Sequence, residues 1–443
     1  MERLIERRGA LALLGLPVAL SLGSSLASCG LHLLPSLTAT DLTAAVEGSA
    51  PPRSPIGDIL TDTDAVRAAY GFTTHLLQGR CETEPEGSVL VSPLSALFAL
   101  ALAENGAAGE TLSQMEEATG MDVQGLTSYL GAYLKRIGGE SLHDTRETGD
   151  PLALKSANSI WLRDSGGLSV RDSYLSTCKG SLAAQVFSAP FDETTRADIN
   201  SWTSSKTDGM IKEVVDEIPD GAQLYLINAL ALDSAWSDPY GDDDVQDDTF
   251  TTEDGTEQSV RMMRSHEVCY LEGDSAEGFV KPYENHDLAF VALLPKTDVG
   301  IGGLVGSLDG ESLRELIAHA VPGVEVDAGL PKFTVRHQAL LNDQLKSMGM
   351  LDAFDASLAD FSPLGATPAG NLAIDSVIQK TFIDVNERGT KAAAATSIGM
   401  SSTAAAPFEP EVREVVLDRP FAYLIIDHQT TTPLFAGVVT SVA

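Results

Sequence analysis

The side chains that most often perform catalysis do not form a catalytic pattern in this chain. No Gly-x-Ser-x-Gly, His-Glu-x-x-His, Walker-type or Gly-x-Gly-x-x-Gly motif occurs, and the eight histidines are scattered. The acidic run Asp242–Asp244, with Asp247 and Asp248, lacks the Gly and the distal Glu of a Ca²⁺ loop. It therefore predicts a solvated acidic loop. The sequence predicts no catalytic residue, no metal site and no cofactor.

One segment is unusual for another reason. Gly389 to Thr396 reads Gly-Thr-Lys-Ala-Ala-Ala-Ala-Thr and follows the β-prone residues Thr381–Ile383. No Pro lies between Glu387 and Ala406, so nothing prevents this segment from adopting a strand. Its side chains are small enough to enter a crowded sheet. The same composition also suits a flexible Ala/Ser linker, and the segment alone does not decide between the two.

Length and charge restrict the class of protein. The 443 residues suffice for two average domains or for one large domain with extra segments, and 43% of them are hydrophobic. The net charge is −34, from 29 Lys and Arg against 63 Asp and Glu. Such a surface repels nucleic acid and anionic lipid, so neither is an expected partner.

The N-terminus resembles an export signal. Arg3, Arg7 and Arg8 precede a short apolar run, and small residues then lead to Cys29. This order predicts a lipoprotein-type signal peptide at 1–28, lipidation of Cys29, and a tether at 29–60. An ordinary secretory signal and a twin-arginine signal are the alternatives. The expected location is extracytoplasmic, as a cell-surface lipoprotein or a secreted protein that meets a membrane only through this anchor.

The other cysteines are too few for a disulfide framework. Cys81, Cys178 and Cys269 have no metal-ligand spacing. Three buried thiols are favoured over one disulfide with a spare thiol.

Helical and strand patterns divide the chain between its two halves. Helices are expected from Asp62–Asp64, after Ser92-Pro93, and within 107–130 and 199–211. Strand patterns dominate from 224 onward, at 224–227, 288–294, 376–385, 421–427 and 434–442. Without regular βα alternation, this distribution predicts an α+β fold with a large mixed or mainly antiparallel sheet. No linker divides the rest of the chain, so 61–443 is one predicted domain.

Short motifs along 62–443 together resemble the serpin family. In order they are Ser92-Pro93-Leu94-Ser95, Asn158-Ser159-Ile160-Trp161, Ile199-Asn200-Ser201-Trp202, Leu226-Ile227-Asn228-Ala229 with Trp236, Leu330-Pro331-Lys332-Phe333, Asp418-Arg419-Pro420-Phe421 and Leu434-Phe435-Ala436-Gly437. Each motif is weak alone, and their order is specific. The resemblance implies the serpin fold, with helices packed on a large central sheet, smaller sheets, and an exposed reactive-centre loop at about 387–417.

The resemblance also implies a function, suicide inhibition of serine endopeptidases and, by extension, of cysteine endopeptidases. The protease would cleave the loop, remain attached as an acyl-enzyme, and be distorted when the loop enters the sheet. The implied hinge comprises Glu387, Gly389, Thr390, Ala392, Ala393, Ala394 and Ala395. The family's usual spacing places the reactive bond between Thr403 and Ala404, or a few residues later.

The residues around that bond limit the target. Residues 400–406 contain no Lys, Arg or aromatic side chain. They favour elastase-like or subtilisin-like proteases over trypsin-like ones. The inhibitor is expected to be a monomer.

Strand geometry explains why the hinge suits insertion. Thr390, Ala392, Ala394, Thr396, Ile398 and Met400 would share one face of a strand, and Lys391 would face the other way. A charged residue at Thr390 would stall insertion, because an unpaired buried charge is unfavourable by several kcal/mol.

Other positions are implied to control sheet opening. Ser92, Ser95 and Asn228 would form a hydrogen-bonded cluster under the sheet, and Trp236 would lie where the loop enters. Gln379 stands where many serpins have a His, so opening should lack that residue's pH dependence.

Two other functions remain as alternatives. A non-inhibitory serpin acting as a surface binding protein would usually have bulky or charged hinge residues, which this hinge lacks. A solute-binding lipoprotein would need two similar lobes and a ligand site, and the sequence shows neither.

Overall fold

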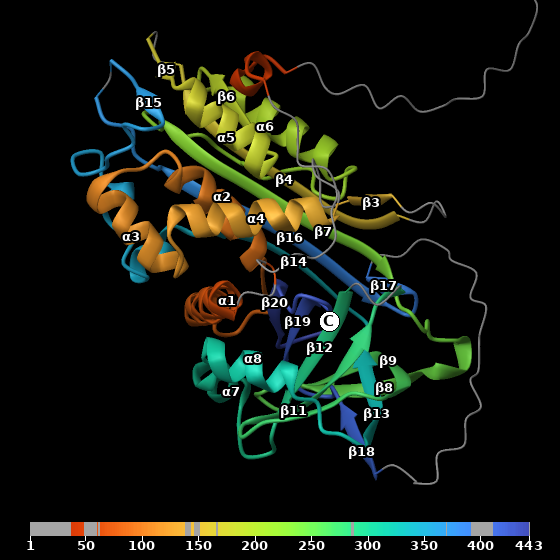
Figure 1. Cartoon of the computed structure of the whole chain (residues 1–443). Helices are drawn as coiled ribbons and strands as arrows, with labels where there is room; N and C mark the ends of the chain where they lie inside the picture. Colours follow the sequence, from red (N-terminus) through yellow and green to blue (C-terminus); the bar gives the residue numbers. More distant parts are fainter. Residues whose placement is uncertain are drawn as a thin grey trace, which may run out of the picture. The chain divides into compact units, whose positions relative to one another are not determined.

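The computed structural model describes residues 37–47, 60, 63–137, 143–145, 151–164, 167–284, 288–368, 370–390 and 411–442. The expected signal peptide at 1–28 and Cys29 lie outside these ranges. The α+β prediction is confirmed, since helices and several sheets make up the described chain (Figure 1). No helix in the described ranges is long and apolar enough to cross a membrane.

The strands form one large sheet and three smaller ones. The large sheet has the order β1-β6-β4-β7-β17-β16-β14, with β3 paired to β4. Its strands are β1 (Thr40–Asp41), β3 (His143–Thr145), β4 (Pro151–Arg163), β6 (Gln185–Ala189), β7 (Leu224–Ala235), β14 (Phe333–Leu340), β16 (Ser376–Asn386) and β17 (Gly389–Thr390). The sheet is mixed, because β4 with β6 and β7 with β16 are parallel while its other pairs are antiparallel.

Two of the smaller sheets pack beside one end of the large sheet. The six-stranded sheet contains β10 (Tyr270–Glu272), β11 (Ala276–Pro282), β12 (Leu288–Pro295), β19 (Phe421–Asp427), β20 (Pro433–Val439) and β2 (Val89–Val91). The four-stranded sheet contains β18 (Glu411–Val416), β13 (Val324–Pro331), β9 (Glu257–Glu267) and β8 (Val245–Thr251). A pair of short strands, β5 (Ser169–Val170) and β15 (Gly365–Ala366), is separate.

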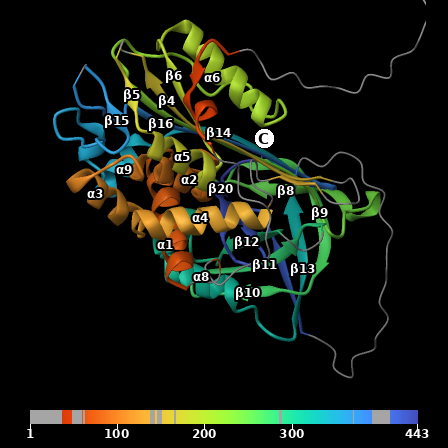
Figure 2. The ribbon, with the colours of Figure 1, turned by 45° about the horizontal axis from the view of Figure 1, so that its top comes forward.

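Helices lie on both faces of the large sheet and against the six-stranded sheet. They are α1 (Thr63–Thr83), α2 (Pro93–Glu104), α3 (Gly109–Thr119), α4 (Val123–Ile137), α5 (Asp172–Leu182), α6 (Glu193–Lys206), α7 (Ile301–Ser307), α8 (Gly310–Ala318) and α9 (Asn342–Ser347). The turned view shows α6 on one side of the sheet, with α2 and α4 on the other (Figure 2).

β7 is buried on both faces, which explains its uninterrupted apolar sequence. Leu224, Leu226, Leu230 and Leu232 belong to the core that includes α2. Tyr225, Ile227, Ala229 and Ala231 belong to a second core with Trp202 of α6. Because alternate residues of a strand point to opposite faces, a central strand between two helical layers must be apolar at nearly every position. Asn228 interrupts this run on the face toward α2.

The segment before α1 differs from the predicted tether. Within the expected tether at 29–60, Thr40–Asp41 form β1 on the edge of the large sheet, and Leu42–Ala45 form a 3₁₀ turn. Asp198 of α6 accepts hydrogen bonds from the Thr38 amide at 2.8 Å, the Thr38 hydroxyl at 2.6 Å and the Ala39 amide at 2.7 Å. Residues 37–47 are therefore part of the folded body, because they supply a strand to an open sheet edge and donors to a buried carboxylate.

Replacing Asp198 should release this segment. Asp198→Ala removes three hydrogen bonds to one carboxylate, so we expect a loss of about 2 kcal/mol in unfolding free energy and faster limited proteolysis before α1. Glu193→Ala is the matched control, because Glu193 lies on the same helix and makes only an exposed ion pair with Arg196. Equal proteolysis of Asp198→Ala and the wild-type chain would contradict the expectation.

The last residue of α2 is a buried acid that the sequence analysis did not single out. Glu104 is 1% exposed and accepts a hydrogen bond from Thr119 Oγ1 at 3.1 Å. Its Oε2 atom has no hydrogen-bond partner within the described ranges. Burial raises the pKa of Glu104 to about 8, and the negative charges of Glu116 and Asp122 add to the shift. The folded chain therefore holds a proton here that the unfolded chain releases above its ordinary pKa of 4.5.

Folding stability should depend on pH through Glu104. Between pH 4.5 and 8 the folded state binds more protons at this group than the unfolded state does. The free energy of unfolding should thus fall with rising pH, by up to about 1.4 kcal/mol per pH unit. Urea unfolding at pH 5.5, 6.5 and 7.5 should show a shallower slope for Glu104→Gln, which mimics the protonated acid. If the variant and the wild-type chain show the same dependence of unfolding free energy on pH, the group that binds the extra proton in the folded state is not Glu104.

Candidate reactive-loop hinge and sheet entrance

The hinge lies where β7 and β16 separate at one end of the large sheet. After β16 the chain turns at Glu387-Arg388, and Gly389–Thr390 return as β17 between the two strands (Figure 1). Thr390 pairs with Val385 of β16 and with Ser234 of β7, antiparallel to both. The first two residues beyond the turn are thus already strands of the sheet. We call this point the entrance and define it by Gly389, Thr390, Trp236 and Tyr283.

Gly389 is required by a close approach of two backbones. Its φ is +153°, and a Cβ atom there would lie 2.1 Å from the Ser234 carbonyl oxygen. No other residue fits between the strands at this level without moving β7.

The side chain of Thr390 is fully buried at the entrance. Its Oγ1 lies 2.6 Å from the hydroxyl of Tyr283, and burial raises the pKa of that tyrosine well above its usual value. The Tyr283 ring stacks on Trp236 with centroids 4.4 Å apart. Trp236 donates from Nε1 to the Asn386 carbonyl at 2.9 Å. A small polar side chain therefore fits at 390, and Trp236 lies beside the predicted hinge.

Glu387 is held at the turn by a cation. Its Oε2 atom lies 2.6 Å from Nζ of Lys332, which follows β13. The hydrogen bond from Lys332 lowers the pKa of Glu387 below its ordinary 4.5. Both side chains are roughly one-third exposed, so solvent screens the pair and its contribution to stability is small.

Below the entrance the sheet is closed by a parallel pair. Residues 376–382 of β16 pair with 225–231 of β7, which places Gln379 opposite Asn228. Asn158 of β4 pairs with Asn228 from the other side. Strand parity puts the three amides in one row on the face toward α2.

The structure divides the predicted switch cluster into two pairs. Gln379 bonds to the backbone of Ser92, accepting from its amide at 2.9 Å and donating to its carbonyl at 2.7 Å. Asn228 donates instead to Oδ1 of Asn158. Ser95 is buried nearby on α2, and its hydroxyl has no partner in the described ranges.

The hydroxyl of Ser92 bonds to a strand of the six-stranded sheet. Ser92 occupies the residue before α2, but its hydroxyl does not cap the helix. It donates to the Leu434 carbonyl of β20 at 2.7 Å. Ser92 therefore ties α2 and β16 to the six-stranded sheet.

Sequence reasoning missed several residues of this site. Asn158 stood in a quoted motif without a role, and nothing local marked Tyr283 as the partner of Thr390. His337, in the strand next to β16, is buried and its Nε2 lies 3.0 Å from Glu84 Oε2. A buried histidine is therefore present in the large sheet although position 379 is Gln.

The remaining predicted loop residues lie outside the described ranges. These are Ala392, Ala393, Ala394 and Ala395 of the hinge and the predicted reactive bond at Thr403 and Ala404. The description resumes at β18, which pairs in parallel with β13 on the edge of the four-stranded sheet.

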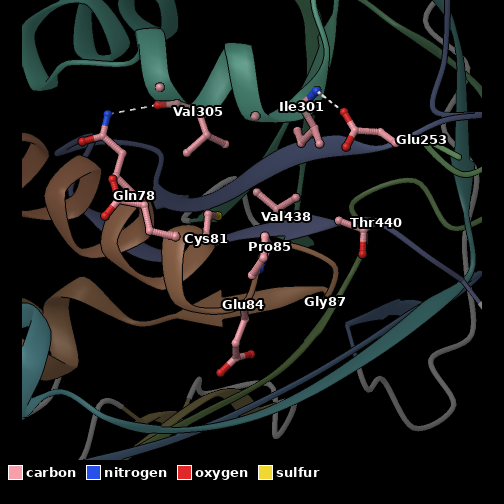
Figure 3. A pocket seen from close by; sticks show the side chains of 13 residues that line it. Gln78, Cys81, Glu84, Pro85, Gly87, Glu253, Ile301, Val305, Val438 and Thr440 are labelled. Carbon is pink, nitrogen blue, oxygen red and sulfur yellow. Dashed lines mark hydrogen bonds between the residues drawn. The ribbon is translucent and has the colours of Figure 1, made fainter.

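A hollow of about 370 Å³ lies apart from the hinge elements (Figure 3). The end of α1, one face of α7 and the end of β20 line it, with Cys81 in its wall. Burial raises the pKa of the Cys81 thiol to about 11, so it remains protonated at neutral pH. Cys178 is buried, whereas Cys81 and Cys269 are half-buried, and all three are free thiols. Within the described ranges there is no group of three or more His, Cys, Asp or Glu side chains that could bind a metal ion.

Comparison with known proteins decides the family. The family model "Serpin (serine protease inhibitor)" matches residues 67–442. The chain belongs to the serpin family. This match confirms the resemblance seen in the sequence. Most serpins are protease inhibitors.

Two relatives from different organisms are similar to this serpin over most of its length. An uncharacterized serpin-like protein of Thermococcus kodakarensis is 31% identical over 79% of this chain and 80% of its own length. A serine protease inhibitor of Cyanea capillata is 31% identical over 81% of this chain and 93% of its own.

Solved structures of the thermophilic serpin tengpin are also similar. Its native state superposes with a TM-score of 0.80 at 37% identity, covering 91% of this chain and 99% of tengpin. Its latent state gives a TM-score of 0.73 at 34% identity, covering 88% and 100%. The serpin fold is therefore shown, and the described arrangement is more similar to the native form.

Breaking the bond between Gln379 and Ser92 should weaken the closed sheet. Gln379→Leu keeps the size of the side chain but leaves the Ser92 amide and carbonyl unpaired in a buried place. We expect a loss of about 1–3 kcal/mol in unfolding free energy, measured by urea unfolding of the uncleaved chain. Gln246→Leu, the same change at an exposed position of β8 whose side chain makes no hydrogen bond in the described ranges, should have little effect. Equal losses in both variants would show that the Ser92 bonds contribute nothing specific.

Proposed function

We propose that this serpin inhibits endopeptidases by inserting its cleaved reactive-centre loop into the large sheet. The observation that carries the proposal is β17. Thr390 already lies between β7 and β16, antiparallel to both. If the residues after Thr390 extend this strand, its pairing fixes their direction and their register with β7 and β16.

Extending that register gives each inserted residue its neighbours. Thr390 pairs with Ser234 and Val385, so six residues later Thr396 would lie between Asn228 and Gln379. Those two residues are opposite each other in the closed sheet. A threonine hydroxyl can both donate and accept, so Thr396 suits the row of amides.

The same register sets the faces of the inserted strand. Ala392 and Ala394 would face the α2 side at the levels of Leu232 and Leu230. Ile398 would follow at the level of Leu226 and bury apolar surface there. Lys391 would face the opposite side, so no charge of the hinge needs to enter the core.

Insertion also improves the pairing of the sheet. β7 and β16 are parallel neighbours over residues 225–231 and 376–382. A strand inserted between them, antiparallel to each, replaces one parallel ladder with two antiparallel ladders. Antiparallel pairs are slightly more stable per residue, and the added strand contributes a second set of backbone hydrogen bonds. The uninserted fold is thus kinetically trapped.

The covalent step belongs to the protease. Its nucleophile attacks the carbonyl carbon of Thr403, the peptide bond to Ala404 breaks, and the new amino terminus departs with the proton. The acyl bond then holds the protease to the segment that inserts. Small residues around the bond fit elastase-like or subtilisin-like proteases.

Complex formation tests the proposal directly. The chain should be incubated with an elastase-like protease and, in parallel, with trypsin, and then analysed on a denaturing gel. We expect an SDS-stable complex with the elastase-like enzyme and none with trypsin at the loop. Cleavage between residues 400 and 410 without a complex would exclude inhibition and favour the non-inhibitory alternative.

The side chain at 390 should determine whether a cleaved chain traps the protease or is released as an ordinary substrate. Thr390→Glu places a charge in a fully buried position beside Tyr283, where an unpaired charge is unfavourable by several kcal/mol. We expect at least a tenfold loss of complex relative to cleaved chain on the gel. Thr390→Val is the matched control, since it keeps the shape without a charge, and it should retain most complex formation.

We further propose that the protein acts outside the cytoplasm, anchored through Cys29. The N-terminal signal pattern supports this location. Detergent phase partitioning of the full chain expressed in a bacterium should place it in the detergent phase, and Cys29→Ser in the aqueous phase. Aqueous partitioning of both proteins would exclude the lipid anchor.

A further inference from the structure

A buried ion pair lies directly behind the entrance. Lys281 of β11 and Glu267 of β9 join the six-stranded and four-stranded sheets, with Nζ and Oε1 2.8 Å apart. Their side chains are 3% and 8% exposed. Ser265 Oγ also donates to Glu267 Oε1, at 2.7 Å. The pair has no part in the insertion mechanism described so far.

Two aromatic rings enclose the ammonium group of Lys281. Nζ lies 4.5 Å from the ring centroid of Tyr240 and 5.6 Å from that of Trp236. At these distances a cation is attracted to the ring face, and the attraction is strongest where water is excluded. Glu267, Tyr240 and Trp236 thus form a cage around one buried charge.

The cage residues also hold the hinge. The Trp236 amide donates to the Arg388 carbonyl and the Tyr240 amide to the Glu387 carbonyl, each at 2.9 Å. Trp236 Nε1 donates to the Asn386 carbonyl at 2.9 Å. Three successive hinge carbonyls are therefore bound by the two residues that enclose Lys281.

Trp236 directly follows the end of β7, and Tyr240 lies in the loop that continues from it. For β7 to move away from β16, these rings must shift relative to the sheets that carry Lys281 and Glu267. A shift would remove the ring faces from a cation that remains buried beside Glu267, and the loss of these cation–π contacts is unfavourable because no water replaces them.

We propose that Lys281 and Glu267 act as a latch that ties the end of β7 to the smaller sheets and slows loop insertion. Lys281 is a positioning residue, since it acts on the hinge through Trp236 and Tyr240. The inference rests on the proposed function, because it concerns the barrier to the same insertion.

The test is the rate at which the uncleaved chain converts to a loop-inserted form on warming. Conversion is followed by loss of loop cleavage and by resistance to urea on a gradient gel, neither of which requires inhibition. The variant Lys281→Met with Glu267→Gln removes both charges without leaving one unpaired. We expect conversion about tenfold faster than in the wild-type chain, in line with the loss of one desolvated cation–π contact.

Controls separate a latch from general destabilisation. Lys281→Arg keeps the charge and the ring contacts and should convert at nearly the wild-type rate. Glu104→Gln changes a buried carboxyl that makes no contact with the hinge and should not speed conversion. The global unfolding rate, measured in parallel, should change less than the conversion rate.

The outcomes are distinct from those of the inhibition test. Equal conversion rates in the double variant and the wild-type chain, or no conversion of either, overturn the latch. If the double variant does not fold, Lys281→Gln with Glu267→Gln, which removes the same two charges but keeps two polar side chains, gives the same comparison. Failure of the proposed function would be seen in the wild-type chain as loop cleavage without a covalent complex.

Discussion

The parallel pairing of β7 with β16 is the constraint on which the rest of this structure depends. The two strands are joined along residues 225–231 and 376–382 but separated at one end by Gly389 and Thr390. A sheet that already holds the first two residues of another strand has a defined route to further pairing. Under the insertion proposed above, the fold carries a more favourable arrangement that it does not adopt.

On the face toward α2, the central strands make a small number of polar contacts in an apolar setting. Gln379 binds the backbone of Ser92, and Asn228 binds Asn158. Apolar contacts tolerate sliding, whereas a buried amide that leaves its partner loses a full hydrogen bond. Placing amides in one row across β4, β7 and β16 concentrates the barrier to strand separation at one level of the sheet.

The large sheet is attached to its surroundings at two further places, the entrance and the edge strand β1, by different interactions. At the entrance the hinge carbonyls are bound by Trp236 and Tyr240, whose rings pack on Lys281. At the edge of the sheet, Asp198 fixes the segment before α1 through three hydrogen bonds. Both arrangements attach a strand of the large sheet to something outside it, so sheet opening involves the neighbouring layers as well.

The sequence by itself determined the fold class and the order of the serpin motifs, and it predicted a hinge of small residues after Gly389. These features could be predicted because strand periodicity and side-chain size depend only on residues that are consecutive in the chain. It did not reveal that residues 37–47 join the sheet, that Ser92 bonds across to β20, or that Lys281 pairs with Glu267. Those contacts join residues distant in the chain, so only the tertiary structure decides which donor meets which acceptor.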